Sequence, residues 1–216
     1  MRHLRLDLGN PDPLVIREAV RVLKQGGIVA FPTDTLYGLA CDPTNRDALE
    51  ALYRLKGRAP SLRLPFVAAD IPQAAGVVRL ESEIARRLAG RFWPGPLTLV
   101  LPLLPDHRLA PWKWGKTLAI RVPAAPVARD LAREAGIPIP ATSANLSGDR
   151  SVSHPDRLEQ ALLSGLDLLL DGGPLPGGLP STILDVTVSP PRLLRPGAIS
   201  RQSLASVPGV EPLVTV

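Results

Sequence analysis

The chain contains very little cysteine and few aromatic residues. Cys41 is the single cysteine among 216 residues, so no internal disulfide bond can form. The first residues include no apolar signal run, and both observations predict a cytoplasmic location in a reducing compartment. No apolar stretch approaches the length of a membrane span, so no membrane partner is expected. Aromatic residues make up 4% of the chain, which is low for a protein that binds single-stranded RNA by base stacking.

Histidine, lysine and asparagine are also scarce. The three histidines show no metal-ligand spacing with one another or with Cys41, so no metal site built by the protein is expected. The formal net charge of +5 is carried mostly by arginine, which favours phosphate-bearing ligands. Codon bias or a hot habitat is the alternative explanation for the arginine content, and 25 prolines beside few asparagines agree with a hot habitat.

The rest of the composition is typical of a folded α/β protein. Hydrophobic residues make up 45% of the chain, enough for a substantial core. Predicted strands alternate with predicted helices nearly throughout, which favours one α/β domain without long linkers or repeats. Caps and periodicity predict helices from Pro13 to Gly26, from Asn45 to Lys56, and over 82–88, 126–134, 155–163 and after Ser200. Apolar runs predict strands at 28–31, 64–69, 97–101, 117–123, 137–141, 166–170, 181–186 and 192–195.

Two of the predicted strands lead directly into clusters of polar residues. Residues 28–31 precede Thr33, Asp34 and Thr35, and residues 137–141 precede Ser143 and Asn145. Ligands bind at the carboxyl ends of strands in open α/β sheets, so both clusters are candidate site segments. Threonine, aspartate, serine and asparagine also form ordinary turns, and this remains the alternative at both places.

Four cations complete the candidate site. Lys56 and Arg58 follow a predicted helix at positions expected to be exposed, where cations also offset the helix dipole. Arg121 interrupts the apolar face of a strand and therefore needs a partner or a ligand. With Arg195 and the neighbouring hydroxyl groups, they are suited to a polyanion beside a small polar molecule.

Common catalytic and nucleotide-binding motifs are missing. The sequence has no GxSxG elbow, no P-loop and no dinucleotide fingerprint, so a nucleotide would have to bind in another way. Residues 171–178 form a glycine-rich loop that is either a plain surface connection or a flap over a site.

Seven segments, in order and with their spacing, resemble the YrdC-like family of threonylcarbamoyl-AMP synthases. They are PTDTLYGLACD (32–42), KGR (56–58), WPGPLT (93–98), AIRVP (119–123), ATSANLSG (141–148), PSTILD (180–185) and LRPG (194–197). The resemblance implies a catalytic domain over residues 1–201 in the short, single-domain form, with 202–216 as a tail that belongs to the domain or is peripheral. It also implies a twisted open mixed α/β sheet with flanking helices and a basic concave groove.

The resemblance further implies a nucleotidyltransferase reaction. L-threonine, bicarbonate and ATP, with Mg²⁺ bound to the ATP, give threonylcarbamoyl-AMP and pyrophosphate. A separate threonylcarbamoyl transferase complex then uses the product to modify tRNA. Contact with tRNA or double-stranded RNA is a further expectation.

Roles follow for the residues that match the family motifs. The threonine end is expected at Thr35, Arg121 and Ser181. The ATP end is expected at Lys56, Arg58, Thr117, Ser143, Asn145, Ser151 and Arg195, with Lys56 and Arg58 as the catalytic pair.

The chain departs from the family pattern between residues 59 and 69. Ala59 stands where a proline is common, and Ala69 stands where a histidine is expected at the threonine end. Two alternatives therefore remain: a YciO-like paralogue, or an RNA-binding module of the same fold without threonine-dependent turnover.

Overall fold

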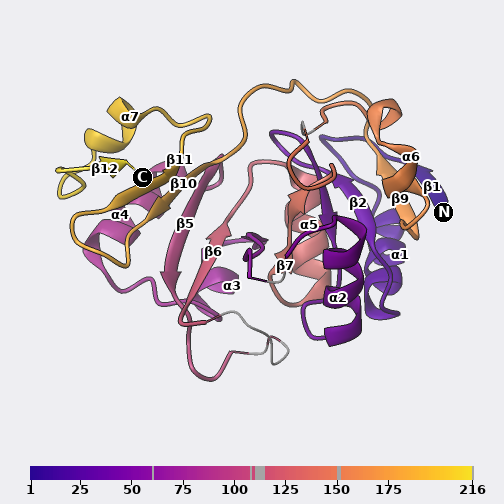
Figure 1. Cartoon of the computed structure of the whole chain (residues 1–216), viewed down its shortest axis with the longest axis horizontal. Coiled ribbons are helices and arrows are strands. Elements are labelled where there is room, and N and C mark those ends of the chain that lie inside the picture. Colours follow the sequence, from indigo (N-terminus) through magenta and orange to yellow (C-terminus); the bar gives the residue numbers. More distant parts are fainter. Residues whose placement is uncertain (60, 108, 110–114, 150–151, 216) are drawn as a thin grey trace.

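The computed structural model describes residues 1–59, 61–107, 109, 115–149 and 152–215. The described strands form two mixed sheets, which lie on opposite sides of the view in Figure 1. The first sheet has the order β1 (Arg2–Arg5), β9 (Leu168–Asp171), β2 (Val29–Pro32), β3 (Tyr37–Ala40) and β8 (Thr142–Ser143). The second has the order β12 (Val214–Thr215), β11 (Arg192–Arg195), β10 (Thr182–Asp185), β5 (Leu97–Pro102), β6 (Thr117–Arg121), β4 (Phe66–Val67) and β7 (Ile139–Pro140).

Both sheets contain parallel and antiparallel strand pairs. In the first sheet β1, β9 and β2 are parallel, and β3 is antiparallel to both β2 and β8. In the second sheet β10 is parallel to β5, and β5 is antiparallel to β6. The α/β class with mixed strand directions is therefore confirmed, but the strands divide into two hydrogen-bonded sheets rather than one.

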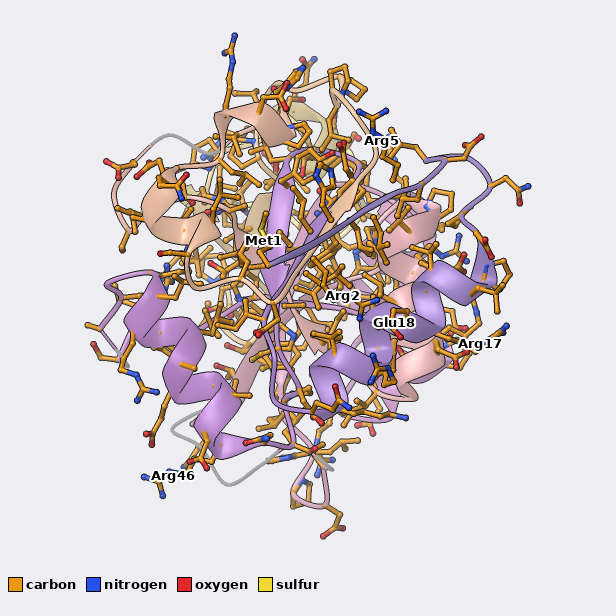
Figure 2. All side chains as sticks on the ribbon, turned by 90° about the vertical axis from the view of Figure 1, so that its right-hand side faces the viewer. Met1, Arg2, Arg5, Arg17, Glu18 and Arg46 are labelled. Carbon is orange, nitrogen blue, oxygen red and sulfur yellow. The ribbon has the colours of Figure 1, made fainter. Side chains whose placement is uncertain are left out.

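Helices α1 (Pro13–Lys24) and α5 (Pro126–Ala135) pack together against the first sheet. Their buried side chains share one apolar cluster with Val29, Phe31 and Leu168 of the strands. Asp12 caps α1 by accepting a hydrogen bond from the Leu14 amide at 2.8 Å, as the sequence predicts. Figure 2 shows Arg2 of β1 near Glu18 of α1, and these side chains form an ion pair that ties the edge strand to the helix.

Helices α2 (Arg46–Leu55), α3 (Ile71–Ala75) and α4 (Glu83–Phe92) contribute to a second, larger apolar cluster. Asn45 caps α2 by accepting from the amides of Asp47 and Ala48. The residues from Arg201 onward include α7 (Arg201–Ala205) and β12, and they bury Leu204 and Val210 in the same cluster. None of the helices in the described ranges is long and apolar enough to cross a membrane.

Several predicted boundaries are wrong. The helix predicted for 82–88 continues through Gly90 to Phe92, because burial of its apolar side outweighs the low helix propensity of one glycine. The helix predicted for 155–163 is a 3₁₀ turn, η1 (Pro155–Arg157), followed by a separate one-turn helix, α6 (Gln160–Leu163). The polar stretch after residue 32 is the turn of a hairpin, with β3 as its second strand.

Candidate functional site

A cavity lies between the two sheets and is lined by residues from both. Its cavity volume is about 180 Å³, and the cavity opens to solvent. The lining includes four arginines and no acidic side chain among the described residues: Thr33, Thr35, Leu36, Tyr37, Gly38, Arg58, Arg63, Pro65, Phe66, Val67, Thr98, Ala119, Arg121, Ala141, Thr142, Ser143, Pro180, Ser181, Ile183 and Arg195. The expected basic concave groove therefore corresponds to this cavity.

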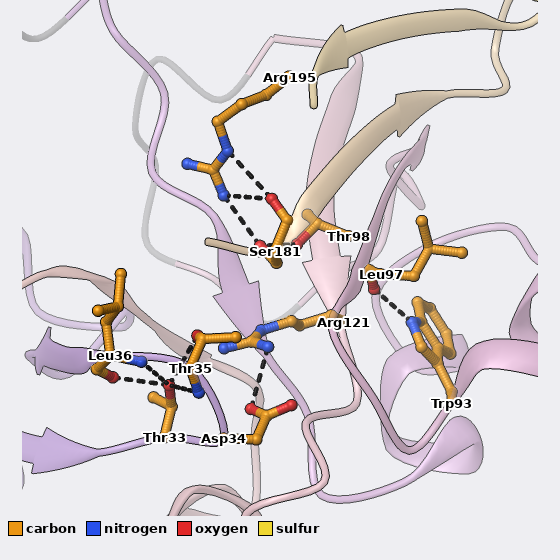
Figure 3. A network of polar contacts seen from close by, with 10 residues as sticks. All are labelled: Thr33, Asp34, Thr35, Leu36, Trp93, Leu97, Thr98, Arg121, Ser181 and Arg195. Carbon is orange, nitrogen blue, oxygen red and sulfur yellow. Dashed lines mark hydrogen bonds and ion pairs between the residues drawn. The ribbon is translucent and has the colours of Figure 1, made fainter. Parts of the chain in front are cut away.

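The turn between β2 and β3 brings Thr33 and Thr35 to one side of the cavity (Figure 3). The Thr33 hydroxyl donates to the Leu36 carbonyl at 2.7 Å and accepts from the amides of Thr35 and Leu36 at 3.2 Å. Both threonines are buried, and their hydroxyl oxygens lie 3.1 Å apart. Residues 33–35 therefore form a turn, which was one of the two alternatives left open by the sequence. The same turn places Thr35 in the cavity lining.

Arg121 reaches the same side of the cavity from β6 and pairs with Asp34. Its Nη1 donates to Asp34 Oδ1 at 3.0 Å, and the two side chains are 8% and 12% exposed. Burial lowers the pKa of Arg121, and the charge of Asp34 opposes this shift. Asp34 Oδ2 is buried without a hydrogen-bond partner among the described residues. The partner that the sequence predicts for Arg121 is thus Asp34. Among the described residues the guanidinium has no other hydrogen-bond partner, so its remaining N–H groups can bind a ligand anion.

Ser181 and Arg195 form the opposite side of the cavity with Thr98 (Figure 3). Arg195 Nη2 donates to the carbonyl and the hydroxyl of Ser181, at 2.7 and 2.9 Å. The Ser181 hydroxyl lies 2.9 Å from Thr98 Oγ1. Burial lowers the pKa of Arg195, with smaller contributions from the charges of Arg121 and Arg58. Residues expected at the threonine end and at the ATP end are therefore in direct contact here.

Lys56 is buried, which corrects the expectation that it is exposed. Only 1% of the residue is accessible to solvent, because its side chain contacts Ser143 at the end of β8 and Asn145 in the segment that follows. Lys56 Nζ donates to the carbonyls of Ser143 and Asn145 and to Asn145 Oδ1, at 2.7 Å for the Asn145 carbonyl. Burial, with a smaller contribution from Arg58, lowers the pKa of Lys56 to about 8. All three ammonium protons therefore have acceptors within the protein.

Arg58 and Arg63 add two further positive charges to the cavity lining. Arg58 donates to the carbonyls of Leu62 and Arg63, at 3.1 and 3.0 Å. Arg63 donates to the Thr117 hydroxyl at 2.6 Å, so Thr117 is linked to the cavity through this arginine. A Cβ at Gly115, where φ is +71°, would lie 2.5 Å from Arg63 Nη2, so the guanidinium would have to shift.

The structure brings together most of the residues that the sequence singles out. Thr35, Arg58, Arg121, Ser143, Ser181 and Arg195 line the cavity. Lys56 and Asn145 lie behind it, and Ser151 lies outside the described residues. Ala69 is buried away from the lining, where its amide donates to Gln73 and its carbonyl accepts from Arg129.

Four residues of the site have no role assigned from the sequence: Thr33, Asp34, Arg63 and Thr98. Thr33 and Asp34 stand in the same polar cluster as Thr35, which is the signal that could have found them. Arg63 belongs to the segment that departs from the family pattern, so no motif indicates it.

The glycine-rich loop 171–178 is anchored in this structure. The Tyr37 hydroxyl donates to the Gly173 carbonyl at 2.7 Å and accepts from the Gly172 amide at 3.1 Å. The Leu175 amide donates to the Ser153 carbonyl, and Leu175 is buried. Burial raises the pKa of Tyr37 to about 12, so its hydroxyl stays protonated and can donate near neutral pH.

Comparison with known proteins identifies the family. The sequence profile of the Sua5/YciO/YrdC family, described as "Telomere recombination", matches residues 21–197. The chain belongs to the Sua5/YciO/YrdC family. The threonylcarbamoyl-AMP synthase of Bacillus subtilis (strain 168) is 40% identical over 204 residues, which cover 94% of this chain and 59% of that protein.

Two solved structures of the family are also similar. Sua5 of P. abyssi, complexed with L-threonine, has a TM-score of 0.89 at 33% identity, over 99% of this chain and 62% of that one. YciO of E. coli has a TM-score of 0.84 at 27% identity, over 94% of this chain and 100% of that one. The chain thus spans less than two thirds of the length of the synthase and of Sua5.

Proposed function

We propose that this Sua5/YciO/YrdC chain is an L-threonylcarbamoyladenylate synthase, a nucleotidyltransferase that supplies threonylcarbamoyl-AMP for tRNA modification in the cytoplasm. The observation that carries the proposal is one cavity with four arginines, several hydroxyl groups and no acidic side chain among its described lining residues. This composition suits an amino acid and a triphosphate bound side by side. The name of the B. subtilis relative and the threonine bound to P. abyssi Sua5 support the same assignment.

The amino acid end of this proposal is formed by Thr35, Arg121 and Ser181. Arg121 is held by Asp34 and retains N–H donors for the α-carboxylate of threonine. Thr35 comes from the turn between β2 and β3 and Ser181 from the residue before β10, and both line the cavity with Arg121 (Figure 3). This arrangement fixes the amino acid and leaves its amine free to react.

The nucleotide end is formed by Arg58, Arg63 and Arg195, with Ser143 from the elbow after β8. Threonine and bicarbonate form a carbamate with loss of water, and a carbamate oxygen then attacks the α-phosphorus of ATP while pyrophosphate leaves. Such a reaction depends on positioning and on neutralising phosphate charge, not on a protein nucleophile. Thr117 acts through Arg63, and Lys56 with Asn145 holds the elbow that carries Ser143.

A magnesium ion fits this site only as part of the nucleotide. The described lining offers hydroxyl groups and arginines but no carboxylate, so the ion would be held by triphosphate oxygens and water. When bound, it neutralises phosphate charge. The arginines of the chain neutralise the rest and orient the leaving pyrophosphate.

Pyrophosphate release tests the proposed function. The purified chain is expected to release pyrophosphate only when ATP, L-threonine and bicarbonate are all present. Release that does not depend on threonine would contradict the proposal and favour a YciO-like activity. Salt-dependent RNA binding without nucleotide turnover would favour the RNA-binding module. Transfer of the product to tRNA by a threonylcarbamoyl transferase complex is the second stage of the same assay.

A further inference from the structure

The side-chain amide of Asn145 is fixed in one orientation by its neighbours. Its Nδ2 donates to the Asp149 carbonyl at 2.6 Å, and its Oδ1 lies 3.4 Å from Lys56 Nζ. The opposite orientation would bring two donors together at Lys56 and two acceptors together at Asp149. Asn145 is 6% exposed, so water has little access to satisfy such mismatched groups. The amide oxygen, not the amide nitrogen, therefore faces Lys56.

This orientation assigns the proton of the Ser143 hydroxyl group. Ser143 Oγ forms a hydrogen bond with Asn145 Oδ1, and an amide oxygen can only accept, so Ser143 is the donor. Among the described residues, no group donates to Ser143 Oγ in return, and Ser143 lines the cavity. A hydroxyl group has one proton and two lone pairs. Ser143 thus offers a ligand its lone pairs and no proton.

A phosphate oxygen is a poor partner for a hydroxyl group in this state. Phosphate oxygens accept hydrogen bonds, so Ser143 could bind one only by turning its proton away from Asn145 Oδ1. The amide oxygen would then keep only the contact of 3.4 Å with Lys56. A buried acceptor that loses its donor destabilises the complex. The ligand group that meets Ser143 is therefore a donor.

We propose that Ser143 accepts a hydrogen bond from the nucleoside part of ATP and that Asn145 is the positioning residue that imposes this polarity. Outside its phosphates, ATP has N–H and O–H donors only in the adenine amino group and the ribose hydroxyl groups. Arg58, Arg63 and Arg195 have only donors and suit the phosphates. The nucleotide is bound with its nucleoside part at Ser143 and its phosphates at the arginines.

This inference rests on the proposed function and is tested with ATP and with analogues that each lack one donor group. Purine riboside triphosphate lacks the amino group, and 2′-deoxy-ATP and 3′-deoxy-ATP each lack one ribose hydroxyl group. With wild type, the KM for one analogue is expected to be about fivefold above that for ATP, as for the loss of one hydrogen bond. Ser143→Ala should raise the KM for ATP by the same factor and the KM for that analogue no further, since both changes remove one interaction.

Ser164→Ala is the matched control for Ser143→Ala. The Ser164 hydroxyl also donates to an oxygen close by in the chain, the Ala161 carbonyl, but Ser164 lies outside the cavity lining. Its KM values should equal those of wild type. If Ser143→Ala left the KM for ATP unchanged, or raised the KM for ATP and for every analogue by the same factor, the inference would be overturned.

Variants of Asn145 test the positioning role. Asn145→Asp keeps an acceptor for Ser143 and should keep the preference for ATP over the analogue. Asn145→Ala frees the Ser143 proton, so the ratio of the two KM values should fall towards one. An unchanged ratio in folded Asn145→Ala would refute the role of Asn145, and if this variant does not fold, the comparison with Ser143→Ala decides alone.

Calorimetric titration with the same nucleotides gives these comparisons without turnover. A wild-type protein that binds ATP with the expected preference but releases no threonine-dependent pyrophosphate refutes the proposed function alone. Loss of the preference together with normal pyrophosphate release refutes this inference alone.

Discussion

Replacement of Lys56 by methionine is the sharpest test of how the site is built. The change keeps the length of the side chain and removes the ammonium group that donates to two carbonyls and to Asn145 Oδ1. The Asn145 carbonyl then lacks this donor, at a cost of about 1–3 kcal/mol. The Ser143 carbonyl still accepts from the Asn145 amide, and Asn145 Oδ1 still accepts from the Ser143 hydroxyl, so these two oxygens lose less. Removal of a buried charge offsets part of this loss. We therefore expect Lys56→Met to lower the free energy of unfolding by about 1–2 kcal/mol, after the loss of the donor and the removal of the charge are combined.

Lys24→Met is the matched control for this experiment. Lys24 is also at the carboxyl end of a helix, but it is exposed. If helix-dipole compensation were the role of both lysines, the two variants would lose similar stability, about 0.3–1 kcal/mol. The buried contacts predict instead that only Lys56→Met is strongly affected.

Urea unfolding and pyrophosphate release are measured together on both variants. The KM for ATP of Lys56→Met is expected to rise, because the elbow that carries Ser143 loses its support. A denaturation midpoint within error of wild type, with activity lost, would refute the positioning role and show that Lys56 contacts the nucleotide directly.

Three further predictions concern pH, the buried ion pair and the loop. Because the pKa of Lys56 is lowered from 10.5 to about 8, the unfolded chain binds more protons than the folded protein between these values. The stability of wild type relative to Lys56→Met should therefore rise by about 2 kcal/mol from pH 7 to 9.5, and a constant difference in urea unfolding would contradict this. Asp34→Asn should leave the buried charge of Arg121 without its partner, lower the free energy of unfolding by about 3 kcal/mol and raise the KM for threonine. Urea unfolding and steady-state kinetics measure the two effects. If both the stability and the KM were unchanged, the ion pair between Asp34 and Arg121 would be ruled out. Tyr37→Phe should speed amide hydrogen exchange in residues 171–178 and lower stability by about 1–2 kcal/mol, whereas unchanged protection would show that the loop is held elsewhere.

Much of the local structure could be predicted from the sequence because its causes are local. Asp12 and Asn45 cap helices through amides two or three residues away. Gly136 ends α5 with φ at +75°, a conformation that glycine adopts without strain. The boundaries of 155–163 were missed because one residue pattern suits both a continuous helix and two short turns.

The positions of the charged groups could not be predicted in the same way. Arg121 was expected to need a partner, but sequence spacing gives no indication that Asp34, 87 residues away, supplies it. Lys56 was expected on the surface from its place at a helix end. Its burial depends on the elbow at Ser143, which is also 87 residues distant.

The sequence by itself determined the segments of regular structure, the excess of positive charge and the motifs of the Sua5/YciO/YrdC family. Periodicity, capping and turn chemistry act over a few residues, so they can be recognised in one chain. The tertiary structure decided which polar groups meet, since the two sheets bring strands from distant parts of the chain to one cavity. Only that packing distinguishes Arg121, which keeps donors for a ligand, from Lys56, whose protons are all used within the protein.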